Sequence, residues 1–174
     1  MAKPAFRSNS LSEAEQILLI NAIDTFEDLV LFKLALCTGI RREDIVRIER
    51  ANINLEGRRL KFWEGKKQRV LEIPIAESIV PDLTRHLNTP PNKKLLFGMS
   101  GRTAYRHLQK CMKRAGIKKH IAFHDLRRTF VKTARKKGLS MKAVSQITGD
   151  KTSTIELYYS NLDMQELNAE VNKL

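Results

Sequence analysis

The stretch from Phe26 to Cys37 most constrains the fold, because it is apolar on almost every side. Only its first turn and Lys33 interrupt the run of apolar residues. A helix that is apolar all round has to be surrounded by other elements, and Gly39, which follows closely, is typical of a helix end. The sequence therefore predicts a buried central helix, with the rest of the chain packed around it.

The remaining segments predict further helices and few strands. A capping-box pattern at Ser10–Glu13 predicts a helix that runs to about Ile23. Apolar residues at helical spacing predict helices near residues 77–87, 101–115, 123–137, 140–148 and 152–159, and a short last one from Asp163. Two β-like runs, Leu60–Trp63 and Arg69–Ile73, flank a turn that contains Gly65. We expect a mostly α (α+β) domain with a small antiparallel β-hairpin or three-stranded sheet.

The charge of the chain is strongly positive and is concentrated in one region. There are 32 Lys and Arg against 19 Asp and Glu, a net charge of +13. Residues 101–137 hold thirteen of the basic residues, with Asp125 as the one acid. On the amphipathic helix at 101–115 the basic residues that point outward are Arg102, Arg106, Lys110 and Lys113. The pattern favours a polyanionic partner, most commonly nucleic acid; a basic ribosomal or membrane-surface protein is the alternative.

Two cysteines, Cys37 and Cys111, are too few and too isolated for a disulfide framework or a zinc site. We expect both to be small core residues in a reducing compartment. The longest apolar run, Leu29–Thr38, contains Lys33 and is too short to cross a bilayer, and no signal peptide is visible. We therefore expect a cytoplasmic protein without a metal site.

The segment His124–Phe130 combines an imidazole with guanidinium groups. In a helix, His124, Arg127 and Arg128 lie three and four residues apart and share one face. The opposite face carries apolar residues at core spacing: Phe123, Leu126, Phe130 and Ala134. The first face could hold a phosphate, although a solvated basic face is the more common explanation of an isolated pattern of this kind.

Four motifs that follow one another in the chain favour the phosphate interpretation. They are Thr38-Gly-Ile-Arg41 with an acid at Asp44, a lysine in a hairpin that ends at Pro74, His124-x-x-Arg127, and Gly149 ten residues before Tyr159. In this order they resemble the catalytic domain of the tyrosine recombinases, the phage integrase family. The resemblance runs from Ser10 to about Leu162. It implies that residues 10–174 form the catalytic domain, that residues 1–9 are a linker or truncated lead-in, and that the N-terminal core-binding domain is absent.

The resemblance implies a role for each matched residue. Arg41 and Arg127 would hold the phosphate, since guanidinium groups offer forked donors to its oxygens. Tyr159 would be the nucleophile, which in this family forms a covalent 3′-phosphotyrosine. His124 would be the acid–base partner. Lys66 would be the general acid. No metal or nucleotide cofactor is implied.

Neighbouring residues are alternatives or have supporting roles. Tyr158 becomes the nucleophile if the last motif is one residue shorter. Counting back from Pro74 selects Lys66 over Lys67 as the general acid. Asp44 is placed to orient the site. We expect contacts with the DNA backbone from three further residues: Arg42, Lys67 and Arg128.

Asp150 is a departure from the family pattern. At this position, directly after Gly149, the family commonly has His, less often Trp, which donates a hydrogen bond to the phosphate. An ionised carboxylate there would repel the phosphate. Either Asp150 points away and Lys151 supplies the charge, or Asp150 is protonated, or activity is reduced.

The function that the resemblance implies is site-specific recombination or integration of double-stranded DNA. Family members act as tetramers on two duplexes, and Met164–Leu174 is the candidate tail for contacts between subunits. Such a protein would be cytoplasmic and associated with the nucleoid when bound to DNA. Two alternatives stay open: a type IB topoisomerase, which uses the same chemistry, and a DNA-binding module without activity, which Asp150 would favour.

Overall fold

Helix α2 (Phe26–Thr38) lies at the centre of the fold, as predicted. The computed structural model describes residues 9–90 and 93–159. The residues of α2 that form the middle of the core are nearly inaccessible to solvent: Val30, Leu31, Phe32, Leu34 and Ala35. Gly39 ends the helix in the left-handed conformation (φ 64°), which costs a glycine little because it has no Cβ.

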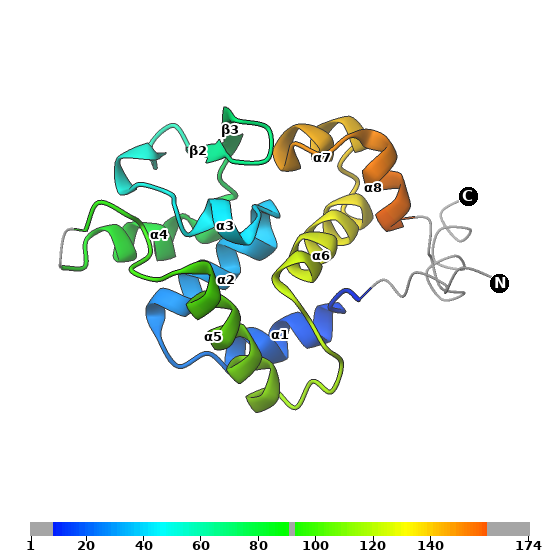
Figure 1. The fold of residues 1–174 in the computed structure, drawn as a ribbon, viewed down its shortest axis with the longest axis horizontal. Helices are drawn as coiled ribbons and strands as arrows, with labels where there is room; N and C mark the ends of the chain where they lie inside the picture. The colour runs from blue at the N-terminus through cyan, green and yellow to red at the C-terminus, as the bar shows by residue number, and fades with distance from the viewer. Residues whose placement is uncertain (1–8, 91–92, 160–174) are drawn as a thin grey trace.

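Four helices are arranged around α2 in Figure 1: α1 (Glu13–Asn21), α4 (Val80–Leu87), α5 (Gly101–Arg114) and α6 (Phe123–Lys136). Helices α7 (Met141–Thr148) and α8 (Thr152–Tyr159) lie beside α6 and form a smaller core with it. The buried residues of this smaller core are Phe130, Val131, Ala134, Val144 and Ile155. Helix α6 therefore contributes to both cores.

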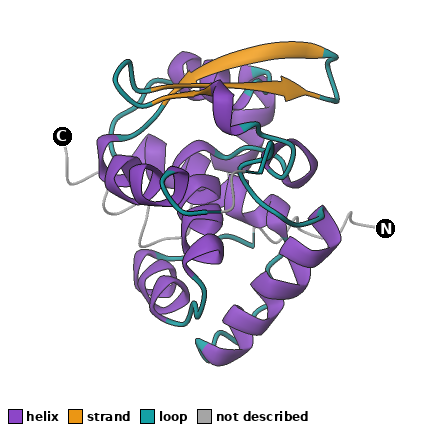
Figure 2. Ribbon diagram, turned by 90° about the vertical axis from the view of Figure 1, so that its left-hand side faces the viewer, coloured by secondary structure: helices purple, strands orange, loops and turns teal. Residues whose placement is uncertain are grey.

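A three-stranded antiparallel sheet covers one edge of the helices (Figure 2). Its strands are β1 (Ile53–Asn54), β2 (Arg59–Glu64) and β3 (Arg69–Pro74), in the order β1-β2-β3. The short helix α3 (Arg42–Ile45) packs against β2, and 3₁₀ turns occupy Arg50–Asn52 and Glu77–Ile79. The prediction of a mostly helical domain with one small antiparallel sheet is confirmed.

The capping box at the start of α1 lies two residues later than predicted. Ser12, not Ser10, is the N-cap, and its hydroxyl accepts a hydrogen bond from the amide of Glu15 at 3.2 Å. The Glu15 carboxylate accepts from the amide of Ser12 at 2.7 Å. Leu11 is buried, and its amide donates to Oγ1 of Thr129 on α6, which holds this segment extended and delays the helix.

Both cysteines are free; Cys111 is buried and Cys37 is half-buried. Across residues 9–90 and 93–159, no helix is both long enough and apolar enough to cross a bilayer. The predictions for the lead-in at residues 1–8 and for the segment 160–174 lie outside the described residues.

Candidate active site

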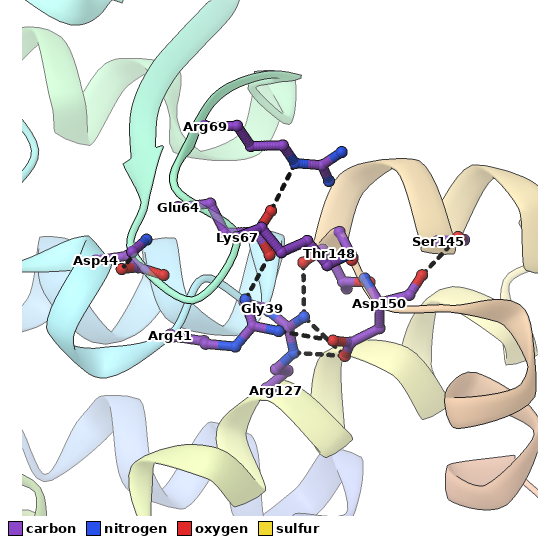
Figure 3. A network of polar contacts seen from close by, with 12 residues as sticks. Gly39, Arg41, Asp44, Glu64, Lys67, Arg69, Arg127, Ser145, Thr148 and Asp150 are labelled. Carbon is purple, nitrogen blue, oxygen red and sulfur yellow. Dashed lines mark hydrogen bonds and ion pairs between the residues drawn. The ribbon is translucent and has the colours of Figure 1, made fainter.

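Two arginines from distant parts of the chain meet at one carboxylate. Arg41 directly precedes α3, and Arg127 lies in the second turn of α6. Nη2 of Arg41 donates to Oδ1 of Asp150 at 2.7 Å. Arg127 donates to Oδ2 of Asp150 from Nε at 2.9 Å and from Nη2 at 2.7 Å (Figure 3). The two arginines predicted to hold a phosphate are thus brought together, and Asp150 bridges them.

Arg127 is not on the exposed face that the helical pattern predicted. Its side chain is 2% exposed. Nη1 donates to the carbonyl of Gly39 and Nη2 to the carbonyl of Thr148, both at 2.6 Å. These carbonyls lie at the C-terminal ends of α2 and α7, where acceptors without helical partners favour a cation. The helical pattern failed here because Arg127, on α6, bonds the C-terminal ends of α2 and α7, while His124 stays exposed.

Asp150 points toward the arginines, so the alternative in which it points away is wrong. It follows Gly149, which ends α7 in the left-handed conformation (φ 74°). The amide of Asp150 donates to Oγ1 of Thr148 at 3.2 Å, and its carbonyl accepts from Oγ of Ser145 at 2.6 Å. These bonds hold its main chain against α7, and the side chain is 11% exposed.

Glu64 is a buried carboxylate that the sequence analysis did not single out. Its side chain is 0% exposed, and it accepts from Nη1 of Arg41 at 2.7 Å and from Nε of Arg69 at 2.9 Å. Burial acts to raise the pKa of Glu64, but the hydrogen bonds and positive charges of these arginines outweigh it and hold the pKa below its usual value. Glu64 lies on the same inward face of β2 as Leu60 and Phe62, four and two residues before it. An acid on an otherwise apolar face of the strand was the signal by which the sequence could have identified Glu64.

Lys66 and His124 line the same open cavity as the arginines. Its volume is about 640 Å³, and its wall includes Arg41 and Arg127. Lys66 lies in the β2–β3 turn and is exposed, and His124 lies in the first turn of α6. The cavity therefore collects four of the five residues for which a catalytic role was predicted.

The pKa of His124 is lowered from its ordinary value near 6.5. Desolvation of the imidazole is the largest cause, followed by the positive charges of Arg128 and Arg127. Asp125 and Asp150 act in the opposite direction but do not cancel these effects. At neutral pH the ring is therefore mainly uncharged and able to accept a proton.

Asp44 supports the tip of the hairpin. Its Oδ1 accepts from the amide of Gly65 at 3.1 Å, and a Cβ on that glycine would stand 3.3 Å from the same oxygen. Gly65 therefore allows the turn that carries Lys66 to approach α3 closely. Within the described part of the chain, Oδ2 of Asp44 is buried without a hydrogen-bond partner.

Lys67 points to the other side of the hairpin from this cavity. Its Nζ donates to the carbonyl of Gly149. Lys67, Arg69, Asp150 and Lys151 line a second open groove between β3 and α7. Lys67 thus joins the hairpin to the end of α7, which leaves Lys66 as the hairpin lysine in the cavity.

The basic residues predicted to contact DNA fall into two groups. Those on α5 are exposed: Arg102, Arg106, Lys110 and Lys113. Of the other three, Lys67 bonds the carbonyl of Gly149, and Arg42 and Arg128 pair with neighbouring acids. Nε of Arg42 bonds Oε1 of Glu43 at 2.7 Å, and Nη1 of Arg128 bonds Oδ1 of Asp125 at 2.9 Å.

Tyr158 and Tyr159 are the last two residues of α8, which begins two residues after Asp150. Helix α8 packs against α6 and α7 through the buried Ile155. The side chains of the two tyrosines lie outside the described part of the structure. The choice between them as nucleophile therefore stays a prediction.

Comparisons with known proteins agree with the family resemblance of the sequence. The model of the phage integrase family matches residues 9–166. The tyrosine recombinase XerD of Staphylococcus aureus is 27% identical over 154 residues, which cover 80% of this chain and 52% of the relative. The chain thus spans about half the length of the curated relatives that it matches.

Three solved structures, of two proteins, share the fold. The crystal structure of XerA recombinase superimposes with a TM-score of 0.85 at 22% identity, over 99% of this chain and 66% of that one. A lambda integrase dimer bound to a COC′ core site gives a TM-score of 0.76 at 19% identity, over 90% of this chain and 61% of that one. Lambda integrase also appears as a tetramer bound to a Holliday junction, with a TM-score of 0.72 at 20% identity over 86% of this chain and 49% of that one. These likenesses confirm the predicted fold.

Proposed function

The chain belongs to the phage integrase family, and from this premise we propose that it is a site-specific DNA recombinase. It cuts and rejoins DNA strands through a covalent 3′-phosphotyrosine, as the family resemblance implies. The observation that carries the proposal is the convergence of Arg41 and Arg127 on two oxygens of one anionic group. A phosphodiester offers two non-bridging oxygens that the same donors can bind.

The arginines stabilise the transition state of phosphoryl transfer. Attack at phosphorus places extra negative charge on the non-bridging oxygens, and preorganised donors stabilise that charge most strongly away from water. Arg127 is held in position by the carbonyls of Gly39 and Thr148, and Arg41 by Glu64. The donors therefore need little rearrangement when the charge develops.

The tyrosine forms the covalent intermediate. The phenolic oxygen of Tyr159 attacks phosphorus, a new P–O bond forms, and the bond to the 5′ oxygen breaks. Tyr158 is the alternative nucleophile. A phenol has a pKa of about 10, so its proton must be removed, and the uncharged ring of His124 accepts it. Lys66 gives a proton to the leaving 5′ oxygen, and rejoining reverses both transfers.

Double-stranded DNA is the proposed partner, and self-association into a tetramer is proposed on it. The net charge of +13 and the exposed cations of α5 support DNA binding. The solved structures of lambda integrase, a dimer on a core site and a tetramer on a Holliday junction, support assembly on DNA. The tail at Met164–Leu174 is the proposed contact between subunits.

A second candidate function is a DNA-binding module without cleavage activity. It is favoured by one observation: Asp150 occupies the donors of both arginines. The relatives named above are recombinases and an integrase, and none of them supports the type IB topoisomerase alternative.

Covalent trapping tests the proposal. A pool of randomised duplexes, each nicked near its centre, allows the short fragment with the freed 5′-hydroxyl to diffuse away after cleavage, so that the phosphotyrosine adduct accumulates. We expect a protein–DNA band that resists denaturation and disappears on protease treatment. If no adduct forms at low salt and high protein concentration while the duplexes are bound, the binding-module candidate is correct instead.

Matched variants assign the roles. Tyr159→Phe should abolish the adduct and Tyr158→Phe should retain it; the reverse result would make Tyr158 the nucleophile. Lys66→Ala should slow cleavage of a normal 5′ oxygen but not of a 5′-thio leaving group, which needs no proton. Lys67→Ala is the control for loss of a hairpin charge. DNA binding should weaken steeply with added salt, because phosphate contacts release counterions.

A further inference from the structure

Asp150 lies where the proposed function places the phosphate. Its Oδ1 accepts from Arg41 at 2.7 Å, and its Oδ2 accepts from Nε and Nη2 of Arg127 at 2.9 and 2.7 Å (Figure 3). Carboxylates and phosphates bind guanidinium groups through the same paired N–H donors. Asp150 and a DNA phosphate therefore compete for the same N–H groups.

Arg127 cannot offer its Nε–Nη2 edge to a phosphate while Asp150 remains. Its Nη1 donates to the carbonyl of Gly39, and its Nη2 also donates to the carbonyl of Thr148. The side chain is 2% exposed, so it has little freedom to turn toward a second anion. Binding of phosphate at this edge requires Asp150 to move.

We propose that Asp150 is an intramolecular substitute for the DNA phosphate, which keeps both arginines engaged in the free protein and has to be displaced by DNA. This rests on the proposed function, since it concerns the phosphate site of that reaction. Asp150 thereby lowers the affinity of the free site and excludes weakly bound anions.

The side chain of Asp150, rather than its main chain, is the part that moves. The main chain is bonded to Thr148 and Ser145 on α7. The groove on the β3 side of α7 is lined by Asp150 together with three cations, Lys67, Arg69 and Lys151. A carboxylate that leaves the arginines therefore finds positive charge in that groove, which reduces the cost of displacement.

Inorganic phosphate tests whether Asp150 fills an oxyanion site. The variants are Asp150→Ala and Asp150→Asn, with Glu156→Gln as the control, because Glu156 is exposed on α8 and its loss changes the net charge equally. In phosphate-free buffer Asp150→Ala should have a lower Tm than wild type, because buried N–H groups of Arg127 lose their acceptor. Phosphate should then raise the Tm of both Asp150 variants by about 3 °C more than that of wild type or Glu156→Gln.

Chloride at matched ionic strength controls for screening. Equal gains of Tm with phosphate in all four proteins would overturn the proposal. Asp150→Asn keeps the shape of the side chain and serves if Asp150→Ala does not fold.

Binding of duplex DNA gives a second readout. If Asp150 competes with phosphate, Asp150→Asn should bind a short duplex about tenfold more tightly than Glu156→Gln, because the site is no longer occupied in the free protein. Equal or weaker binding would mean that Asp150 only positions the arginines. Covalent trapping is scored separately. Absence of an adduct in every variant would refute the recombinase function, while the phosphate and duplex measurements would still decide the role of Asp150.

Discussion

Gly149 lies directly against the carboxylate of Glu64. A Cβ at this position would stand 2.8 Å from Oε1 and 3.0 Å from Oε2. Glu64 in turn holds Arg41, and Asp150 follows Gly149 in the chain. The glycine therefore does more than end α7, since it allows the hairpin and the last helices to close around one cluster of charges.

Replacing Gly149 by alanine should cost more stability than its backbone conformation alone explains. Gly116 is a matched control, because its φ of 70° is close to the 74° of Gly149, while a Cβ there meets no atom of residues 9–90 or 93–159 within 4 Å. Gly116→Ala should lose about 1 kcal/mol of unfolding free energy. Gly149→Ala should lose about 2 kcal/mol or more, since the methyl group also displaces Glu64. Urea unfolding of both variants measures the difference, and equal losses would show that the contact with Glu64 carries no energy.

Glu64 should make stability depend on acidity. Its pKa is lowered in the folded protein, so its ion pairs contribute stability above its ordinary pKa of 4.5, and this contribution is lost as the pH falls through the lower, folded value. Glu64→Gln removes this dependence. At pH 7 the variant should therefore be less stable than wild type in urea, and the gap should narrow below about pH 4.5.

Glu15 also has a lowered pKa, so the pH dependence of unfolding in wild type alone would not isolate the effect of Glu64. Glu72→Gln serves as the control for loss of an exposed hairpin carboxylate that pairs with Arg59 and Lys61. If the difference in unfolding free energy between wild type and Glu64→Gln is the same at pH 7 and pH 3.5, the prediction is contradicted.

The elements of the fold were predictable because their signals are local. The apolar run that became α2, Gly39 at its end and the alternation along β2 each depend on near neighbours in the chain. The capping box was displaced because a distant residue, Thr129, bonds Leu11. Local patterns do not contain such contacts.

The candidate site was predictable in its membership but not in its bonding. Motif order placed Arg41, Lys66, His124 and Arg127 together, and they share one cavity. The burial of Arg127 escaped the helical pattern, because that pattern assigns a charged residue to the solvent face, and its acceptors lie on two other helices. The pairing of Arg41 with Glu64 on β2 and with Asp150 after α7 depends on packing between segments that are far apart in the sequence (Figure 3).

Arg127 should be essential to stability as well as to activity. A lysine at this position has a single ammonium group and cannot reach Gly39, Thr148 and Asp150 together in the geometry of the guanidinium. Arg127→Lys should therefore lose about 3 kcal/mol of unfolding free energy, because the lysine keeps the charge but leaves buried acceptors of Arg127 without a donor. Arg128→Lys, on the same helix, should lose less than about 1 kcal/mol. Equal losses in urea unfolding would show that Arg127 is not a structural link between helices.

The pKa of His124 should lie below its ordinary value, and removing nearby positive or negative charges should shift that pKa in opposite directions. Because Arg128 lowers the pKa of His124 and Asp150 raises it, Arg128→Gln should shift the pKa upward and Asp150→Asn should shift it further down. NMR titration of the imidazole in each variant measures both shifts. Lys110→Gln removes an exposed charge on α5 that is not among the named causes of the shift, and it is the control for net charge. Because the pKa of His124 is lowered in the folded state, the unfolded chain binds a proton at His124 more readily as the pH falls through 6.5. Wild type should therefore lose unfolding free energy between pH 7 and pH 5.5 relative to His124→Gln. Shifts of one sign in both variants would show that charge does not set the protonation of His124 in this site.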